Sequence, residues 1–158
     1  MTTSIGITEQ NRKAVAKALS ILLADEFVLY TKTRNAHWNV EGIDFNDKHL
    51  FFEGQYQQLD EIADNVAERI RTLGHYAPGT LSDFLKLTHL SEKTGQQNNS
   101  KGFIKELLED HESIIVFIRK NITDFDDKYK DAGSSDFITG LIKEHEKIAW
   151  MLRASLNK

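Results

Sequence analysis

The chain has 158 residues, 40% of them hydrophobic and 28% charged, a balance that is typical of one globular domain and excludes a disordered chain. It contains no apolar run of membrane-spanning length, and residues 1–10 lack the basic patch and apolar stretch of a secretory signal. The absence of cysteine excludes disulfides, thiolate metal sites and a cysteine nucleophile and fits a cytoplasmic protein, while a net charge of −4 gives no bulk attraction for nucleic acid.

Four long helical patterns follow one another along the chain, each with apolar residues at intervals of three and four. They are predicted over about residues 8–35, 47–73, 100–124 and 135–156. A short helix is predicted at about residues 81–86, in the long connection between the second and third patterns. No segment convincingly predicts a β-strand. This order predicts an all-α four-helix bundle with one long crossover, the arrangement of ferritin-like folds, in a single domain of residues 1–158.

Candidate capping residues mark some of the helix ends. Thr8 can cap the first helix, and Asn46 or Asp47 can cap the second, because their side chains accept hydrogen bonds from free backbone N–H groups. Gly74 can end the second helix, since glycine adopts the left-handed conformation that often follows a last helical turn.

The second predicted helix carries a ribbon of polar side chains beside its apolar stripe. At about 100° per residue, five of them fall along the same edge of that stripe. They are His49, Glu53, Asp60, Asp64 and Glu68. One histidine with several carboxylates suits iron or another divalent metal, although a charged ribbon on a helix is by itself most often only solvated surface.

The spacing along the ribbon limits how a metal could bind. His49 and Glu53 are one turn apart, and so are Asp64 and Glu68, but His49 and Asp64 are separated by about 22 Å of helix rise. No single metal, with bonds of about 2 Å, can be held by both within one chain. The residues therefore form either two unrelated clusters or one composite site with an antiparallel second copy of the helix. Such a two-fold dimer would contain two equal sites.

Residues on and before this ribbon match a family pattern. The matching residues are His37-Trp38-Asn39, His49 twelve residues later, Asp64, Glu68-Arg69 and the final stretch 145–154. Over nearly its whole length, the chain resembles the Dps family, the miniferritins related to DNA-binding proteins from starved cells. The resemblance implies that His37, His49 and Glu53 of one subunit bind metal together with Asp64 and Glu68 of its two-fold mate. The family often has aspartate where this chain has Glu53, a departure that keeps the carboxylate.

The resemblance also implies a function. Family members form hollow shells of twelve subunits that oxidise Fe²⁺ to Fe³⁺, usually with hydrogen peroxide, and hold the ferric mineral inside. We therefore expect iron to be the metal and this chain to be a ferroxidase. Trp38 resembles a family residue that shields the site and intercepts stray radicals, so it joins the catalytic candidates. Acidic residues of the family line pores that attract Fe²⁺, and the candidates here are Asp127, Asp131 and Asp136, for which a polar loop or helix cap is the alternative.

Two other functions compete with iron oxidation. A DNA-compacting role gave the family its name, but the segment before the first helix has no Lys or Arg and the chain ends with a single lysine, so we expect weak or absent DNA binding. A helical assembly module without metal chemistry is the other alternative.

Two further histidines, His111 and His145, lie within apolar stripes. A second metal site inside the bundle, completed by Glu112 and Glu146, is one interpretation. Core histidines with hydrogen-bond partners are the better one, because the Glu-x-x-His motif of larger di-iron bundles is absent.

Overall fold

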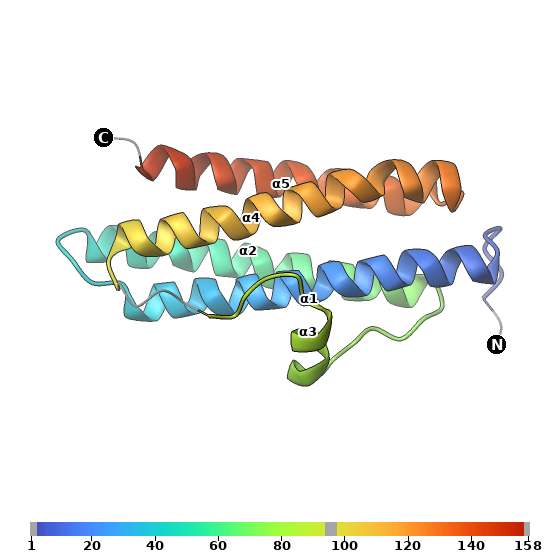
Figure 1. The fold of residues 1–158 in the computed structure, drawn as a ribbon, viewed down its shortest axis with the longest axis horizontal. Coiled ribbons are helices and arrows are strands. Elements are labelled where there is room, and N and C mark those ends of the chain that lie inside the picture. The colour runs from blue at the N-terminus through green and yellow to red at the C-terminus, as the bar shows by residue number, and fades with distance from the viewer. Residues whose placement is uncertain (1–2, 94–97, 157–158) are drawn as a thin grey trace.

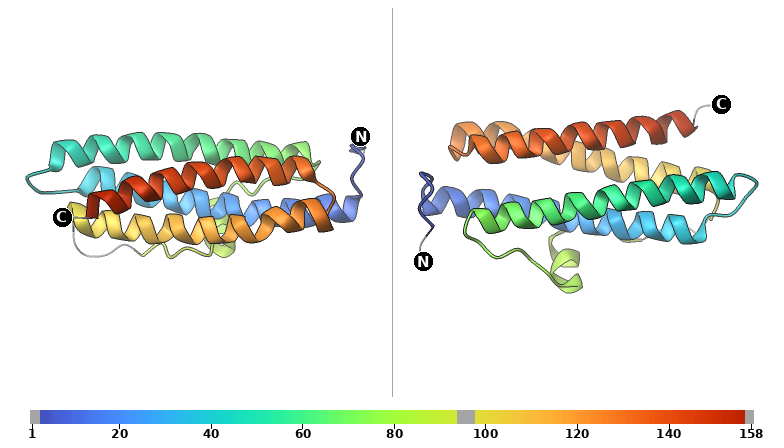
Figure 2. Two further views of the ribbon diagram at one scale, coloured as in Figure 1. Left: turned by 90° about the horizontal axis from the view of Figure 1, so that it is seen from above. Right: turned by 180° about the vertical axis from the view of Figure 1, so that it is seen from behind.

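The computed structural model describes residues 3–93 and 98–156. Its long helices are α1 (Glu9–Asn39), α2 (Phe45–Thr72), α4 (Ser100–Thr123) and α5 (Ala132–Leu156), with α3 (Leu81–Leu87) between α2 and α4. The helices form one elongated bundle in which α1 pairs with α2 and α4 pairs with α5 (Figures 1 and 2). The all-α ferritin-like prediction is confirmed, since the described residues form no β-strand, only one isolated bridge. No helix among these residues is both long and apolar enough to cross a membrane.

Capping side chains fix most of the helix starts. Thr8, Thr80 and Asn99 each accept a hydrogen bond from a backbone N–H in the first turn of α1, α3 and α4, which confirms the predicted cap at Thr8. The prediction that Asn46 or Asp47 caps α2 is wrong. The helix begins earlier, at Phe45, because a turn after Gly42, whose φ is 137°, carries the chain directly into it.

The apolar stripes of the four long helices meet in one core. Phe52, Leu59 and Ile70 of α2 are fully buried there, with none of their surface exposed to solvent. The crossover is held against the outside of the bundle by Phe84 of α3, whose ring stacks on Phe27 of α1 with centroids 4.4 Å apart. The long connection between α2 and α4 therefore follows α1, as Figure 1 shows.

A chain of three ionisable side chains crosses the middle of the core. Glu26 Oε1 lies 2.8 Å from His145 Nε2, and His145 Nδ1 lies 2.9 Å from His111 Nδ1. All three side chains are completely buried, so the prediction of core histidines with hydrogen-bond partners is confirmed. The alternative of a metal site completed by Glu112 and Glu146 is wrong, because these two carboxylates form ion pairs with arginines on the exposed surface.

The end of α4 differs from the predicted regular helix. It continues into η1 (Asp124–Lys128), one turn of π-helix, and Phe125 in this turn is buried in the core. The chain then turns through Lys130, which has a φ of 56°, and α5 begins at Ala132. The helix begins three residues earlier than predicted, because Asp131 accepts a hydrogen bond from the backbone N–H of Ser134 (2.9 Å) and so caps the first turn.

We expect Gly74→Ala to lower the free energy of unfolding by about 1–2 kcal/mol, since an L-residue is strained in the left-handed region. Gly74 follows α2 with a φ of 88°, and an added Cβ would lie 2.3 Å from Thr3 Oγ1. Guanidinium unfolding of both proteins measures the difference. Gly140→Ala is the control, because a Cβ at that position in α5 meets nothing within 4 Å in the subunit. An equal loss for both variants would contradict the conformational explanation.

Candidate metal site

His37, near the end of α1, and His49, near the start of α2, face each other across the two helices. Their rings stack with centroids 3.8 Å apart and an angle of 22° between planes. His37 Nδ1 lies 2.8 Å from the backbone oxygen of His49, and His49 Nδ1 lies 2.8 Å from the backbone oxygen of His37. The antiparallel packing of α1 and α2 thus brings together two histidines that are twelve residues apart in the sequence.

This reciprocal pairing fixes the tautomer of both rings. A carbonyl oxygen can only accept, so each Nδ1 must carry the proton and donate it. In a neutral imidazole, Nε2 then keeps its lone pair, which is the form that binds a metal. Backbone carbonyls that hold the other ring nitrogen are the usual support of metal-binding histidines. His37 is 8% exposed and His49 is half-buried, so the pair lies just beneath the surface.

The three carboxylates of the predicted site lie along α2. Glu53 is half-buried and follows His49 by one turn, on the same side of the helix. Asp64 and Glu68 are exposed and lie further along α2, with Asp64 about 22 Å from His49 by helix rise. Within residues 3–93 and 98–156, none of the three carboxylates forms an ion pair.

One subunit therefore offers two separate parts of the predicted ligand set. Among the described residues, no group of three or more His, Asp or Glu side chains is arranged to hold a metal ion. His49 and Asp64 are too far apart to share a metal within one chain, and in the described residues Glu53 does not complete a three-residue group with His37 and His49. Asp60, the remaining member of the ribbon, is exposed and lies near Arg34.

An aromatic cluster around Arg34 touches the histidine pair through Tyr56, a connection that the sequence did not predict. The guanidinium lies 4.6 Å from the ring centroid of Tyr56 and 5.2 Å from that of Trp38. Tyr56 in turn packs edge-on against His37, with centroids 5.2 Å apart. His37 and Trp38 follow Arg34 by three and four residues on α1, and this spacing could have indicated that both lie beside Arg34.

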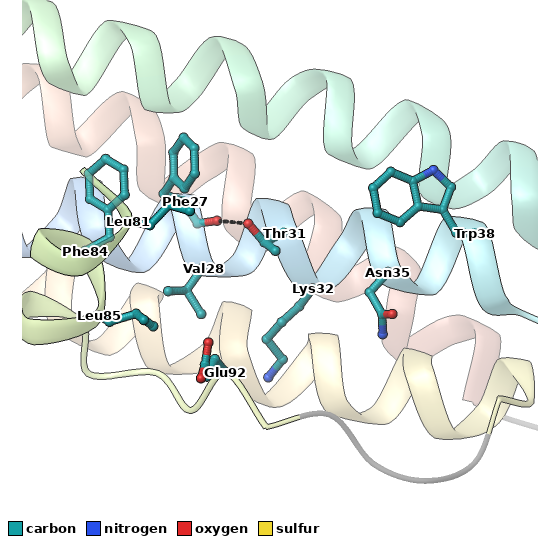
Figure 3. Close-up of a pocket in the computed structure, with 10 residues that line it drawn as sticks. All are labelled: Phe27, Val28, Thr31, Lys32, Asn35, Trp38, Leu81, Phe84, Leu85 and Glu92. Carbon is teal, nitrogen blue, oxygen red and sulfur yellow. Dashed lines mark hydrogen bonds between the residues drawn. The ribbon is translucent and has the colours of Figure 1, made fainter. Parts of the chain in front are cut away.

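A pocket lined in part by Trp38 is mainly apolar, unlike the histidine pair. It has a volume of about 370 Å³ and lies between α1 and α3, lined mainly by apolar side chains such as Phe27, Phe84 and Leu85 (Figure 3). Glu92 is its one acidic residue and it contains no histidine. The pocket therefore lacks the donor set of a metal site.

The three pore candidates lie in different environments. Asp127 on η1 and Asp136 on α5 are exposed. Asp131 is only 2% exposed, caps α5, and lies 3.1 Å from the guanidinium of Arg69. Its carboxylate is thus already engaged inside the subunit.

Comparisons with known proteins show the family to which the chain belongs. A family model, that of the ferritin-like domain, matches residues 16–158. The chain is 41% identical over 151 residues to an uncharacterized low temperature-induced protein of Nostoc sp., with 96% of this chain and 84% of the relative covered. It is 36% identical over 138 residues to the DNA protection during starvation protein of Helicobacter pylori, with 87% and 95% covered.

Solved structures give the same result. A Dps protein from Vibrio cholerae O1, described as a member of a broad superfamily of ferritin-like diiron-carboxylate proteins, superposes with a TM-score of 0.92 at 31% identity, covering 99% of this chain and 98% of that one. Dps from Thermosynechococcus elongatus superposes with a TM-score of 0.88 at 29% identity, covering 94% of each chain. With a matching family model and Dps relatives above 30% identity over most of their length, the chain belongs to the Dps family of ferritin-like proteins.

Proposed function

We propose that this protein is a ferroxidase that binds Fe²⁺ at sites shared between two subunits, oxidises it, and stores the ferric product inside a homo-oligomeric shell of twelve subunits. The observation that carries the proposal is the His37–His49 pair, in which both Nδ1 atoms are engaged with backbone oxygens. Two imidazoles stacked 3.8 Å apart, each with its Nδ1 engaged by a backbone oxygen, leave both Nε2 lone pairs for a metal and can supply half of a metal site.

The other half comes from a second copy of α2. A two-fold axis across α2, midway between His49 and Asp64, would place the histidine pair and Glu53 of one subunit against Asp64 and Glu68 of its mate. Gly54 is exposed with open space above it, so two α2 backbones can approach closely there. Two neutral imidazoles with three carboxylates suit Fe²⁺, which accepts both nitrogen and oxygen ligands.

The chemistry assigned to this site is a two-electron oxidation. Two Fe²⁺ ions each give one electron to one hydrogen peroxide molecule, its O–O bond breaks, and both oxygens leave as water or hydroxide without release of hydroxyl radical. Hydrolysis of Fe³⁺ then forms the mineral and releases protons. Trp38, 61% exposed beside His37, covers the site and intercepts radicals that escape it.

The remaining parts of the proposal concern iron entry and location. The exposed carboxylates of Asp127 and Asp136 are the better candidates for pores that attract Fe²⁺, since charge of one sign at a narrow opening concentrates the opposite ion. A cytoplasmic location, where Fe²⁺ stays reduced until it is oxidised at the site, completes the account.

Asp64→Ala is expected to slow peroxide-driven Fe²⁺ oxidation about 100-fold, because it removes a ligand from the mate's half of the site. Stopped-flow absorbance of Fe³⁺ after anaerobic loading measures the rate. The matched control is Asp60→Ala, one turn away on the same exposed ribbon, which should keep the wild-type rate. Equal rates for wild type and Asp64→Ala would remove Asp64 from the site.

DNA binding is the second candidate, because relatives such as the Helicobacter pylori protein are named for DNA protection during starvation. The net charge of −4 opposes it. We expect no gel shift of duplex DNA at physiological salt, and a shift under those conditions would make DNA binding a function of this chain.

A further inference from the structure

Arg69 connects the metal-ligand helix to the start of α5. Its Nη2 lies 3.1 Å from Asp131 Oδ1, and its Nε donates to Ser134 Oγ at 3.0 Å. Asp131 at the same time accepts hydrogen bonds from the backbone N–H of Ser134 and from its hydroxyl. The side chains of Arg69, Asp131 and Ser134 are therefore all bonded to one another. Arg69 directly follows the candidate ligand Glu68 in the sequence.

The buried carboxylate of Asp131 needs the positive charge of Arg69. Asp131 is only 2% exposed, and a buried carboxylate is costly unless an opposite charge and several hydrogen-bond donors accompany it. Arg69 supplies the charge, and its planar fork reaches both partners at once, which a lysine could not do. Because the side chain of Arg69 is 27% exposed and that of Asp131 is 2% exposed, solvent screens this pair much less than a surface ion pair.

Through Arg69, this group attaches α2 to the start of α5. Among the described residues, the hydrogen bonds between α2 and the start of α5 are those of Arg69. The other hydrogen bond from α2 to α5, between Gln58 and Glu144, lies further along α5. The hydrophobic effect is non-directional, whereas a guanidinium that binds two partners adds geometric specificity to how a helix is oriented. Gly133 confirms the close approach, since a Cβ there would lie 3.0 Å from Arg69 Nη2.

We propose that Arg69 and Asp131 are positioning residues for the metal site: their ion pair holds the half of α2 that carries Asp64 and Glu68 in the orientation that the mate's histidines require. The proposal rests on the shared site proposed above. It also assigns Asp131 to this pair instead of to a pore. A displacement of about 1 Å at a reacting group can change a rate by about 100-fold, so the orientation of α2 matters for binding.

Co²⁺ is the probe, because its visible absorption reports ligand geometry and it binds without being oxidised. Arg69→Gln and Asp131→Asn should each raise the Co²⁺ concentration for half-saturation about tenfold and alter the spectrum. Asp131→Asn keeps a good helix cap, so its effect separates orientation from capping. Arg71→Gln is the matched control, since Arg71 is exposed on the same helix and its side chain donates to the backbone oxygen of His75 and lies over the ring of Tyr76, away from Asp131.

The double variant Arg69→Gln with Asp131→Asn should bind Co²⁺ no more weakly than the weaker single variant, because both changes break one contact. Size-exclusion chromatography and circular dichroism should show intact, helical assemblies for all four variants. The positioning role is overturned if both single variants keep the wild-type Co²⁺ half-saturation and spectrum. It is also overturned if the losses of affinity in the double variant are additive. Neither result would contradict the shared site. A wild-type Co²⁺ spectrum that is unaffected by His37→Ala and His49→Ala would overturn the shared site and, with it, this inference.

Discussion

Replacing His49 with alanine is expected to slow Fe²⁺ oxidation by about 100-fold while leaving the fold almost unchanged, because it removes one ligand from a polar, near-surface site. The substitution should leave the position of His37 unchanged. The backbone oxygen of His49 stays in place and still accepts from His37 Nδ1, so the remaining imidazole keeps its tautomer and orientation. His37→Ala is the mirror experiment, since it leaves His49 Nδ1 hydrogen-bonded to the backbone oxygen of residue 37. Stopped-flow absorbance of Fe³⁺ after addition of peroxide gives both rates.

His89→Ala is the control for this pair, because the His89 side chain is 54% exposed and lies on the crossover, away from α2. Its rate should equal that of wild type. If both His37→Ala and His49→Ala oxidise iron as fast as wild type, the ferroxidase proposal fails and the polar ribbon on α2 is only surface.

Acid is expected to destabilise the apo protein through the buried chain Glu26–His145–His111. Burial, followed by the nearby His145, lowers the pKa of His111 well below its usual value of about 6.5. The unfolded chain therefore takes up a proton at His111 as the pH falls through about 6.5, whereas the folded protein does not. The contribution of His111 to the free energy of unfolding is therefore fully present above that pH. It falls by about 2 kcal/mol between pH 7 and pH 5.

His111→Gln isolates the contribution of this histidine. The amide of glutamine can donate to His145 Nδ1 but does not titrate, so the pH dependence of its unfolding between pH 7 and pH 5 should be flatter than that of wild type by about 2 kcal/mol. Guanidinium unfolding of both proteins across this range supplies the comparison. Parallel pH profiles would show that His111 is protonated in the folded state as readily as in the unfolded chain.

The fold could be predicted from the sequence because its signals are local and repeated. Apolar residues such as Phe52, Leu59 and Ile70 recur at helical spacing, and each of them is buried as expected. The predicted N-terminal caps of α2 were wrong, since the geometry of the loop at Gly42, not the capping side chain, sets where that helix begins. The π-helical turn at Phe125 also escaped prediction, because it depends on how one aromatic ring fits the core.

The candidate site could be predicted as a set of residues but not as a geometry. The resemblance to the Dps family implied the pair of His37 and His49, whereas their reciprocal bonds to backbone oxygens depend on the exact path of the loop between α1 and α2. Glu26 was missed as the partner of His145, although acids within an apolar stretch of α1, such as Asp25 and Glu26, are a usable signal of buried polar groups. Asp131 was grouped with the exposed acids around it, because its burial follows from Arg69, which is 62 residues away in the chain.

The measurement that tests the shared site most directly is complementation between two inactive variants. His49→Ala and Asp64→Ala subunits are mixed in equal amounts, dissociated and reassembled, and peroxide-driven Fe²⁺ oxidation is followed. A mixed two-fold dimer contains one site with both defects and one wild-type site, so random reassembly should restore about a quarter of the wild-type rate. A reassembled mixture that is no faster than the two variants measured separately would contradict a site built from two subunits.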